Sequence, residues 1–191
     1  MTDEKLLQKA SRGDEAAFVL LYERHHAPLH RFAYRMLGSA ALAEEIVQDL
    51  FLGLIKAPGR FDSSRSELRT YLFAAARNLA NKHFRHGELA LDEARDEPCP
   101  PEREEPLRKL LDEELSNEVQ MAVAALPPLQ REALILFEYE EMSLAEIAAV
   151  VGTDTGTIKS RLHRARGRLR RSLAFYFKSA GEIVSVGKIK R

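Results

Sequence analysis

Apolar residues recur at helical spacing along most of this chain, and no stretch alternates apolar and polar residues as a strand would. Asp14 is placed to cap a first long helix, Pro28 to kink it and Gly38 to end it. The spacing predicts three long helices in the N-terminal half, over residues 15–37, 41–55 and 67–86. We therefore predict an all-α fold.

A pair of shorter helices follows in the C-terminal half. Ser143 and Glu146 form the S-x-x-E pattern of a capping box, and Gly152 can adopt the left-handed conformation that ends a helix. After a turn of about three residues, Asp154 is placed to cap a second helix. This order predicts a helix-turn-helix, a motif whose second helix enters the DNA major groove, and an ordinary helical hairpin is the alternative.

The second helix of this pair has two contrasting faces. Its narrow apolar stripe consists of Ile158, Leu162, Ala165 and Leu169. The opposite side carries Ser160, His163, Arg164, Gly167 and Arg171, bordered by Lys159 and Arg170. Seven Lys and Arg and no acid lie between residues 157 and 171, whereas a solubilising helix mixes acids among its bases. This face suits an anion, and its side chains are of the types that read base edges.

The net charge of the chain conceals an uneven distribution. The 191 residues hold 29 Lys and Arg and 29 Asp and Glu, for a formal net charge of zero. Between residues 88 and 118, twelve acids face four bases, and four prolines fall within residues 96–106. Such a segment cannot form a regular helix, so we predict two small helical domains joined by a flexible acidic linker.

Composition also excludes several classes of protein. The single cysteine, Cys99, excludes an internal disulfide and any multi-cysteine zinc site. No apolar run approaches the roughly 18 residues of a membrane span, and the start MTDEK is unlike a signal peptide, so we expect a cytoplasmic protein without membrane insertion. His26 and His30 lack a third ligand at suitable spacing, which favours a polar helix face over a metal site. Without a phosphate loop, nucleophile elbow or carboxylate pair, we expect no catalysis, no cofactor and no small-molecule substrate.

Two features of the N-terminal half suit binding. Leu52 lies on a polar helix face among acids and an amide, which is typical of the centre of a protein-binding patch, although single exposed leucines are common. In the loop and helix that follow, basic residues alternate with aromatic ones. This combination suits single-stranded nucleic acid, although several of the aromatic residues must belong to the core. The bases are Lys56, Arg60, Arg65, Arg69, Arg77, Lys82 and Arg85, and the aromatics are Phe61, Tyr71, Phe73 and Phe84.

The chain resembles the bacterial sigma-70 family, in its extracytoplasmic-function (ECF) group, over nearly everything from Gly13 to Leu173 except the linker. The resemblance rests on three stretches in order and spacing: AEEIVQDLFLGLIKAPGRFD, LRTYLFAAARNLANKHFRH and LPPLQREALILFEYEEMSLAEIAAVVGTDTGTIKSRLHRARGRLR. It implies an alternative sigma factor that binds core RNA polymerase and recognises promoter −10 and −35 elements. The implied domains are a region 2-like unit over 1–87, the linker over 88–115, a region 4-like unit over 116–177 and a tail over 178–191.

The resemblance also implies which residues bind each partner. The residues expected to contact the clamp helices of the largest polymerase subunit are Glu45, Gln48, Asp49 and Leu52. The residues expected at the −10 element are Arg60, Phe61, Arg65, Tyr71, Arg77, Asn78 and Lys82. The residues expected to read the −35 element are Thr157, Lys159, Ser160, His163 and Arg164. An anti-sigma factor is a further implied partner.

The chain departs from the family pattern at three places. Leu42 stands where the family often has an acid, a frequent Trp near Tyr71 is missing, and the tail after Phe175 has no counterpart. A free-standing helix-turn-helix regulator is the alternative function, and it would form a symmetric dimer on palindromic sites. RNA binding is a weaker alternative, because a helix-turn-helix reads B-form grooves.

Overall fold

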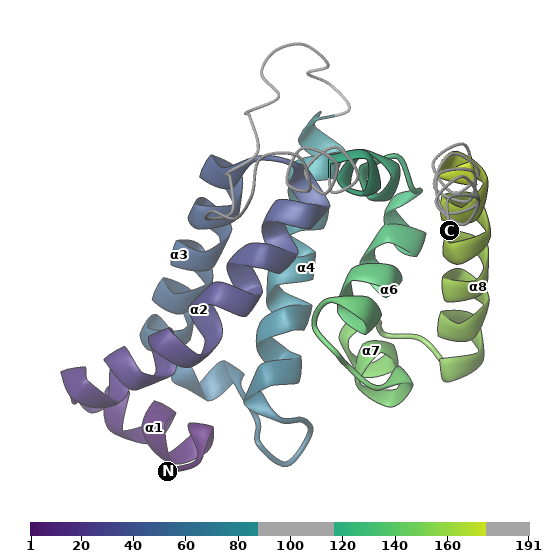
Figure 1. Cartoon of the computed structure of the whole chain (residues 1–191). Helices are drawn as coiled ribbons and strands as arrows, with labels where there is room; N and C mark the ends of the chain where they lie inside the picture. Colours follow the sequence, from purple (N-terminus) through teal and green to yellow (C-terminus); the bar gives the residue numbers. More distant parts are fainter. Residues whose placement is uncertain (88–116, 175–191) are drawn as a thin grey trace, which may run out of the picture.

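The computed structural model of this chain describes residues 1–87 and 117–174, and within them it is helical without any strand, as predicted (Figure 1). The helices are α1 (Asp3–Ala10), α2 (Glu15–Leu37), α3 (Ala40–Lys56), the 3-10 helix η1 (Pro58–Arg60), α4 (Leu68–Gly87), α6 (Pro128–Glu138), α7 (Leu144–Val151) and α8 (Thr155–Ser172). Residues 117–124 are also helical. The predicted linker with Cys99, and the predicted tail, lie outside the described residues.

The ends of the long helices follow the predicted signals closely. The Asp14 carboxylate accepts a hydrogen bond from the Ala17 N–H at 3.0 Å, and Gly38 ends α2 in the left-handed region with φ 73°. Helix α3 begins one residue earlier than predicted, because the Ser39 hydroxyl caps it by accepting from the Leu42 N–H at 3.3 Å. The loop before α4 contains η1, which is too short to show a periodicity in the sequence.

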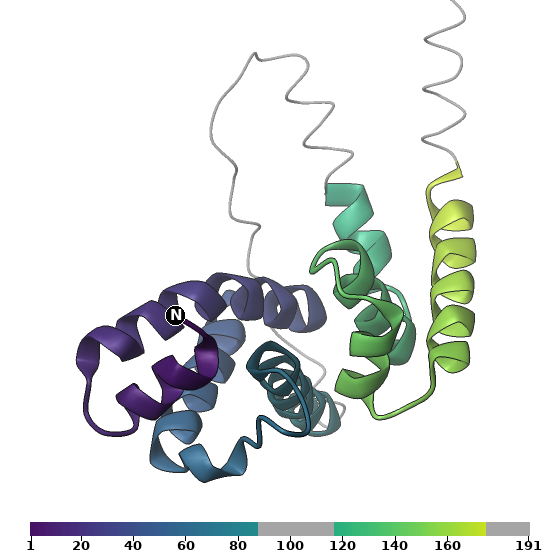
Figure 2. The ribbon, with the colours of Figure 1, turned by 90° about the horizontal axis from the view of Figure 1, so that it is seen from below.

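Helices α1 to α4 form the N-terminal half, with α2 packed against α1, α3 and α4 (Figures 1 and 2). Phe32 of α2 meets Phe73 of α4 edge to face, with ring centroids 5.6 Å apart. Phe73 is therefore one of the core aromatics and not a stacking platform for bases.

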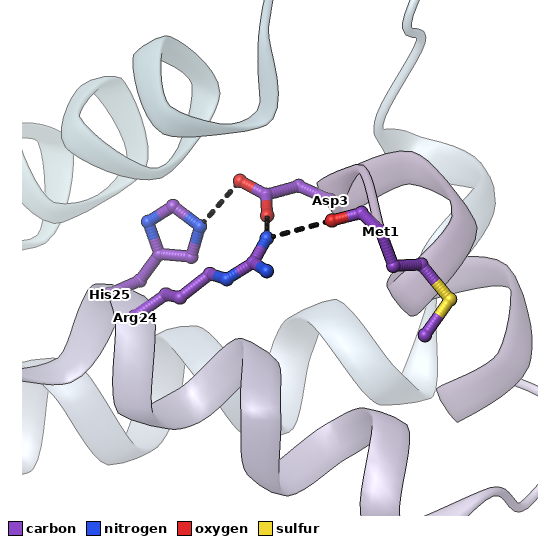
Figure 3. Close-up of polar contacts among 4 residues, drawn as sticks. All are labelled: Met1, Asp3, Arg24 and His25. Carbon is purple, nitrogen blue, oxygen red and sulfur yellow. Dashed lines mark hydrogen bonds and ion pairs between the residues drawn. The ribbon is translucent and has the colours of Figure 1, made fainter.

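Helix α1 is absent from the sequence prediction, which starts the first domain's helices at Asp14. It buries Leu6, Leu7 and Ala10. The Asp3 carboxylate joins α1 to α2 by accepting from Arg24 at 2.7 Å and pairing with the buried His25 at 2.8 Å (Figure 3). Burial tends to raise the pKa of the Asp3 carboxyl, but the hydrogen bonds from Arg24 and His25 outweigh it and lower that pKa.

The C-terminal half lies directly against the N-terminal half. Helix α7 packs on α4, and α6 packs on α2 (Figure 1). Buried apolar residues of both halves form a single cluster. The two predicted domains are thus closed on one another in this structure.

Replacing Leu6 with Ala tests how much α1 contributes to the fold. Leu6 is fully buried, so the truncation leaves a cavity, and we expect the free energy of unfolding to fall by about 2–5 kcal/mol. Lys5→Ala is the matched control, because Lys5 is exposed on the same helix and its loss should cost less than about 0.5 kcal/mol. Urea unfolding followed by circular dichroism measures both, and equal stability of the two variants would contradict the packing of α1.

Candidate nucleic-acid interface

Helix α7 and the turn before α8 have the helix caps that the sequence predicts. The Ser143 hydroxyl accepts from the Glu146 N–H at 3.2 Å, and the Glu146 carboxylate accepts from the Ser143 N–H at 2.8 Å. Gly152 ends α7 with φ 73°, a conformation that favours glycine. The predicted helix-turn-helix is confirmed, with α8 as its second helix.

The start of α8 is held by Asp154. Its carboxylate accepts from the Thr157 N–H at 2.8 Å and from the Thr157 hydroxyl at 2.6 Å, and these bonds lower the pKa of Asp154. The hydroxyl of Thr157 is therefore engaged within the protein. Of the other residues predicted to read DNA on this helix, Arg164 also bonds within the protein, donating from Nε to the Ser160 carbonyl at 3.3 Å.

The rest of α8 has the two faces that its periodicity predicts. Ile158, Leu162 and Ala165 are buried, which fixes the rotation of the helix. The opposite face then presents the other four predicted residues, all exposed: Lys159, Ser160, His163 and Arg164. Their exposure leaves them accessible to a DNA groove.

Not every base of α8 projects outwards. The Arg161 guanidinium turns inward to the buried Glu132 of α6, at 3.2 Å. Arg166 pairs with Glu138 at 2.7 Å and lies over the Phe137 ring. These two arginines tie α8 to α6, so the run of seven bases combines structural and exposed side chains.

The predicted patch on α3 lies on the surface. Glu45, Gln48 and Asp49 are exposed, and Leu52 keeps 53% of its surface accessible. Ile55, one turn further on, is also exposed at 37%, and the sequence analysis missed it. Its position was readable, because nine residues at 100° each place Ile55 on the side of α3 opposite the buried Ile46.

The predicted −10 residues of α4 divide between two faces. At 100° per residue, Tyr71, Asn78 and Lys82 fall within about 40° of one another, whereas Arg77 is about 100° from Asn78. Asn78 and Lys82 are exposed and Tyr71 is half-buried. The Arg77 guanidinium instead faces the C-terminal half, where it bonds both carboxylate oxygens of Glu132 at 2.7 and 3.3 Å.

The loop before α4 places an aromatic pair beside exposed arginines. The Phe61 and Tyr71 rings lie 5.5 Å apart and both are half-buried, while Arg60 and Arg65 are exposed. Asp62 orders the loop by accepting hydrogen bonds from the Ser64 N–H and hydroxyl, and these bonds lower the pKa of Asp62. The side chains of Phe84 and Arg85 lie outside the described part of the chain.

The two histidines considered as metal ligands have another environment. His26 pairs with Glu44 at 3.3 Å, and its ring stacks on that of His30 at 5.9 Å. Residues 1–87 and 117–174 contain no group of three or more His, Cys, Asp or Glu arranged to hold a metal ion. None of the helices described is both long and apolar enough to cross a membrane.

Two family models match the chain: Sigma-70 region 2 over residues 21–88 and Sigma-70 region 4 over residues 116–169. The chain is 33% identical to ECF RNA polymerase sigma factor SigE of Mycolicibacterium smegmatis, over 85% of this chain and 65% of that protein. It is 30% identical to ECF RNA polymerase sigma factor SigW of Bacillus subtilis, over 91% of this chain and 97% of that protein. The chain belongs to the ECF group of the sigma-70 family.

Similar solved structures support membership of this family. The structure of CnrH in complex with the cytosolic domain of CnrY is similar with a TM-score of 0.68 at 26% identity, covering 90% of this chain and 97% of CnrH. The sigma factor RpoE of Bartonella quintana, in complex with the anti-sigma factor NepR, gives a TM-score of 0.68 at 27% identity, covering 82% and 96%. The chain is an alternative sigma factor that directs transcription initiation, and a free-standing regulator is not favoured.

Proposed function

We propose that this sigma factor divides its work among three surfaces. The polymerase-binding surface on α3 consists of Glu45, Gln48, Asp49 and Leu52. The strand-capture surface, on α4 and the loop before it, consists of Arg60, Phe61, Arg65, Tyr71, Arg77, Asn78 and Lys82. The groove-reading surface on α8 consists of Thr157, Lys159, Ser160, His163 and Arg164. The observation that carries the proposal is the rotation of α8, whose buried stripe leaves four base-reading side chains exposed on a helix-turn-helix.

The groove-reading surface takes the −35 element as duplex. Lys and Arg side chains are suited to the O6 and N7 acceptors of guanine, and Ser and His can contact either bases or phosphates. The exposed face of α8 from Lys159 to Arg164 carries no acid, so the phosphates flanking the groove meet no repulsion there. The helix therefore combines sequence reading with electrostatic attachment.

The polymerase-binding surface takes the clamp helices of the largest subunit of core RNA polymerase. Leu52 and Ile55 supply an exposed apolar centre, and Glu45, Gln48 and Asp49 supply a polar rim. This anatomy is common at protein interfaces, where an apolar anchor is surrounded by polar groups that exclude water. The acidic rim also predicts a basic counterpart on the polymerase.

The strand-capture surface takes the −10 element once its strands have separated. An unpaired base needs an aromatic plane for stacking and an amide for its edge, and the backbone needs cations. Tyr71, Asn78 and Lys82 share one face of α4, with Phe61 against the Tyr71 ring. Arg77 joins this surface only if it leaves Glu132.

The wider role follows from these contacts. A sigma factor works with core polymerase and chromosomal promoters, so we infer a cytoplasmic location. The polymerase performs the chemistry, and this chain contributes binding and positioning without a cofactor of its own. Because the similar RpoE is seen with an anti-sigma factor, we also propose an anti-sigma factor as a partner of this chain.

Replacing Lys159 or Arg164 with Ala tests the groove-reading surface. Each substitution should weaken binding to a −35 duplex by about 1–3 kcal/mol, because a base contact is lost. Arg168→Ala is the control, since Arg168 is exposed on the same helix outside the surface. Titration of holoenzyme with matched and scrambled duplexes measures the effect. An equal loss of affinity for both duplexes would show that the residue contacts only phosphates.

Replacing Leu52 with Glu tests the polymerase-binding surface. Binding to core polymerase should weaken by about 2 kcal/mol or more, because an interface anchor becomes charged. The melting temperature should not change, since Leu52 is exposed. Leu20→Glu is the matched control, because Leu20 is an exposed leucine on α2. Equal core binding by both variants would refute the role of Leu52.

Replacing Asn78 with Ala tests the strand-capture surface. The variant holoenzyme should assemble and bind upstream duplex, yet open the −10 element poorly, because the amide that meets the splayed base is gone. A premelted bubble should restore only the part of the defect that is due to melting. Permanganate footprinting of thymines on linear and premelted templates measures this, and normal opening on the linear template would contradict the assignment.

A further inference from the structure

Two rows of side chains meet where α2 packs on α3 (Figure 1). The row on α2 consists of rings: His26 stands one helical turn from Tyr22 and from His30, and the ring centroids lie 4.7 and 5.9 Å from its own. The row on α3 contains Glu44 and Gln48, which are four residues apart on one side of that helix. His26 Nε2 lies 3.3 Å from Glu44 Oε2, so the two rows are joined.

The orientation of the Gln48 amide follows from its partner. The Gln48 Nε2 atom lies 3.0 Å from Glu44 Oε1. An ionised carboxylate can only accept hydrogen bonds, so the NH2 group must be the end of the amide that faces Glu44. The amide oxygen of Gln48 is then the outer end, and within residues 1–87 and 117–174 it accepts no hydrogen bond.

The Glu44 carboxylate is held from both helices. Gln48 donates to one of its oxygens, and His26 contacts the other. The bond from Gln48 lowers the pKa of the Glu44 carboxyl, burial opposes that change, and the bond from His26 lowers the pKa further. The carboxyl therefore stays ionised at neutral pH, and the His26 ring must carry a hydrogen on Nε2 in order to donate to it.

The link to α2 matters because the bond within α3 is weak. An exposed polar pair at four-residue spacing on one helix stabilises only slightly, and by itself it leaves both side chains free to change rotamer. The His26 side chain is only 29% exposed, and its neighbour Tyr22 contacts the buried Phe51 of α3, with ring centroids 4.9 Å apart. The ring row is thus anchored in the core, and it gives Glu44 and Gln48 a fixed support.

We infer that His26 and Glu44 are positioning residues for the polymerase-binding surface. They hold Gln48 with its NH2 group turned to Glu44 and its oxygen presented to the partner. Gln48 is exposed together with Glu45 and Asp49, so all three side chains offer acceptors. The partner group opposite Gln48 is therefore a hydrogen-bond donor, of the kind that lysine or arginine supplies. This inference rests on the proposed function, which assigns Gln48 to that surface.

Two substitutions remove the support without touching Gln48. Glu44→Ala deletes the carboxylate, and His26→Phe keeps a ring in the row but deletes the N–H group. Ordering a side chain in advance spares its cost during association, so each variant should bind core polymerase about two- to tenfold more weakly than wild type. Glu4→Ala is the matched control for a lost negative charge, because Glu4 is exposed on α1 outside the three binding surfaces.

A double-mutant cycle separates positioning from direct contact. In a Gln48→Ala background, Glu44→Ala should have no further effect on the Kd for core polymerase, because no amide remains to be positioned. Glu44→Gln should keep more affinity than Glu44→Ala, since an amide oxygen also accepts from Gln48 and the amide NH2 can donate to the other tautomer of His26. A role that depends on the charge of Glu44 would make these two variants equal.

The positioned amide can be observed in the free chain. Heteronuclear NMR of the nitrogen-labelled full chain shows the side-chain NH2 groups of its glutamines, and Gln48→Ala identifies the signals of Gln48. In wild type these signals should lie away from the positions of a solvent-exposed amide. In Glu44→Ala and His26→Phe they should move to those positions, and in Glu4→Ala they should not move.

Each result decides the inference. Wild-type Gln48 signals at solvent-exposed positions would overturn the positioning of the amide. An effect of Glu44→Ala that persists in the Gln48→Ala background would show that Glu44 contacts the polymerase directly, and it would overturn the indirect role. If circular dichroism shows that His26→Phe is unfolded, Glu44→Ala decides alone. Unchanged core binding by Gln48→Ala would overturn the proposed function of this surface and this inference with it, whereas the NMR signals test the support without polymerase.

Discussion

Glu132 is a fully buried carboxylate that lies between two arginines from distant parts of the chain, Arg77 and Arg161. An isolated ionised group in this position would lose its hydration without compensation, and in this conformation the two arginines supply that compensation. These pairs add to the buried apolar residues that fix the rotation of α8. Arg161 is thereby engaged away from the exposed face of α8, and Arg77 is engaged about 100° around α4 from Asn78.

The basic residues of these helices have two roles, because some form ion pairs within the protein and others are exposed. On α8, Arg161 and Arg166 bond to α6, while Lys159 and Arg164 project into solvent. The apolar stripe alone is narrow, and the inward arginines extend the surface over which α8 is held. A helix anchored in this way presents its outward side chains on a rigid support, which favours specific recognition of a groove.

Helix ends and binding surfaces are strongly linked in this protein. Asp154 caps α8 through Thr157, and the capping box at Ser143 and Glu146 positions α7 before it. Glu146 also lies 4.0 Å from Arg69 of the other half, so a residue that starts a helix also takes part in the contact between the halves. Local capping and the relation between the halves therefore share one carboxylate.

The sequence by itself determined the all-α fold, the helix-turn-helix and the outward face of α8, because caps, glycine turns and helical periodicity are local signals. It also placed Leu52 on the surface, where the structure has it. It did not predict α1, since that helix, unlike the equally short α7, has no side-chain cap and gains its stability by burying Leu6 and Leu7.

Only the tertiary structure decided which charges are inward and which are outward. Glu132 and Glu140 look like ordinary surface acids in the sequence, yet both are buried, because their partners lie on helices far away in the chain. The same holds for Arg77, whose distance from Asn78 around α4 is readable but whose carboxylate partner is not. Ion pairs between distant segments leave no spacing in the sequence, and they become visible only when packing brings the segments together.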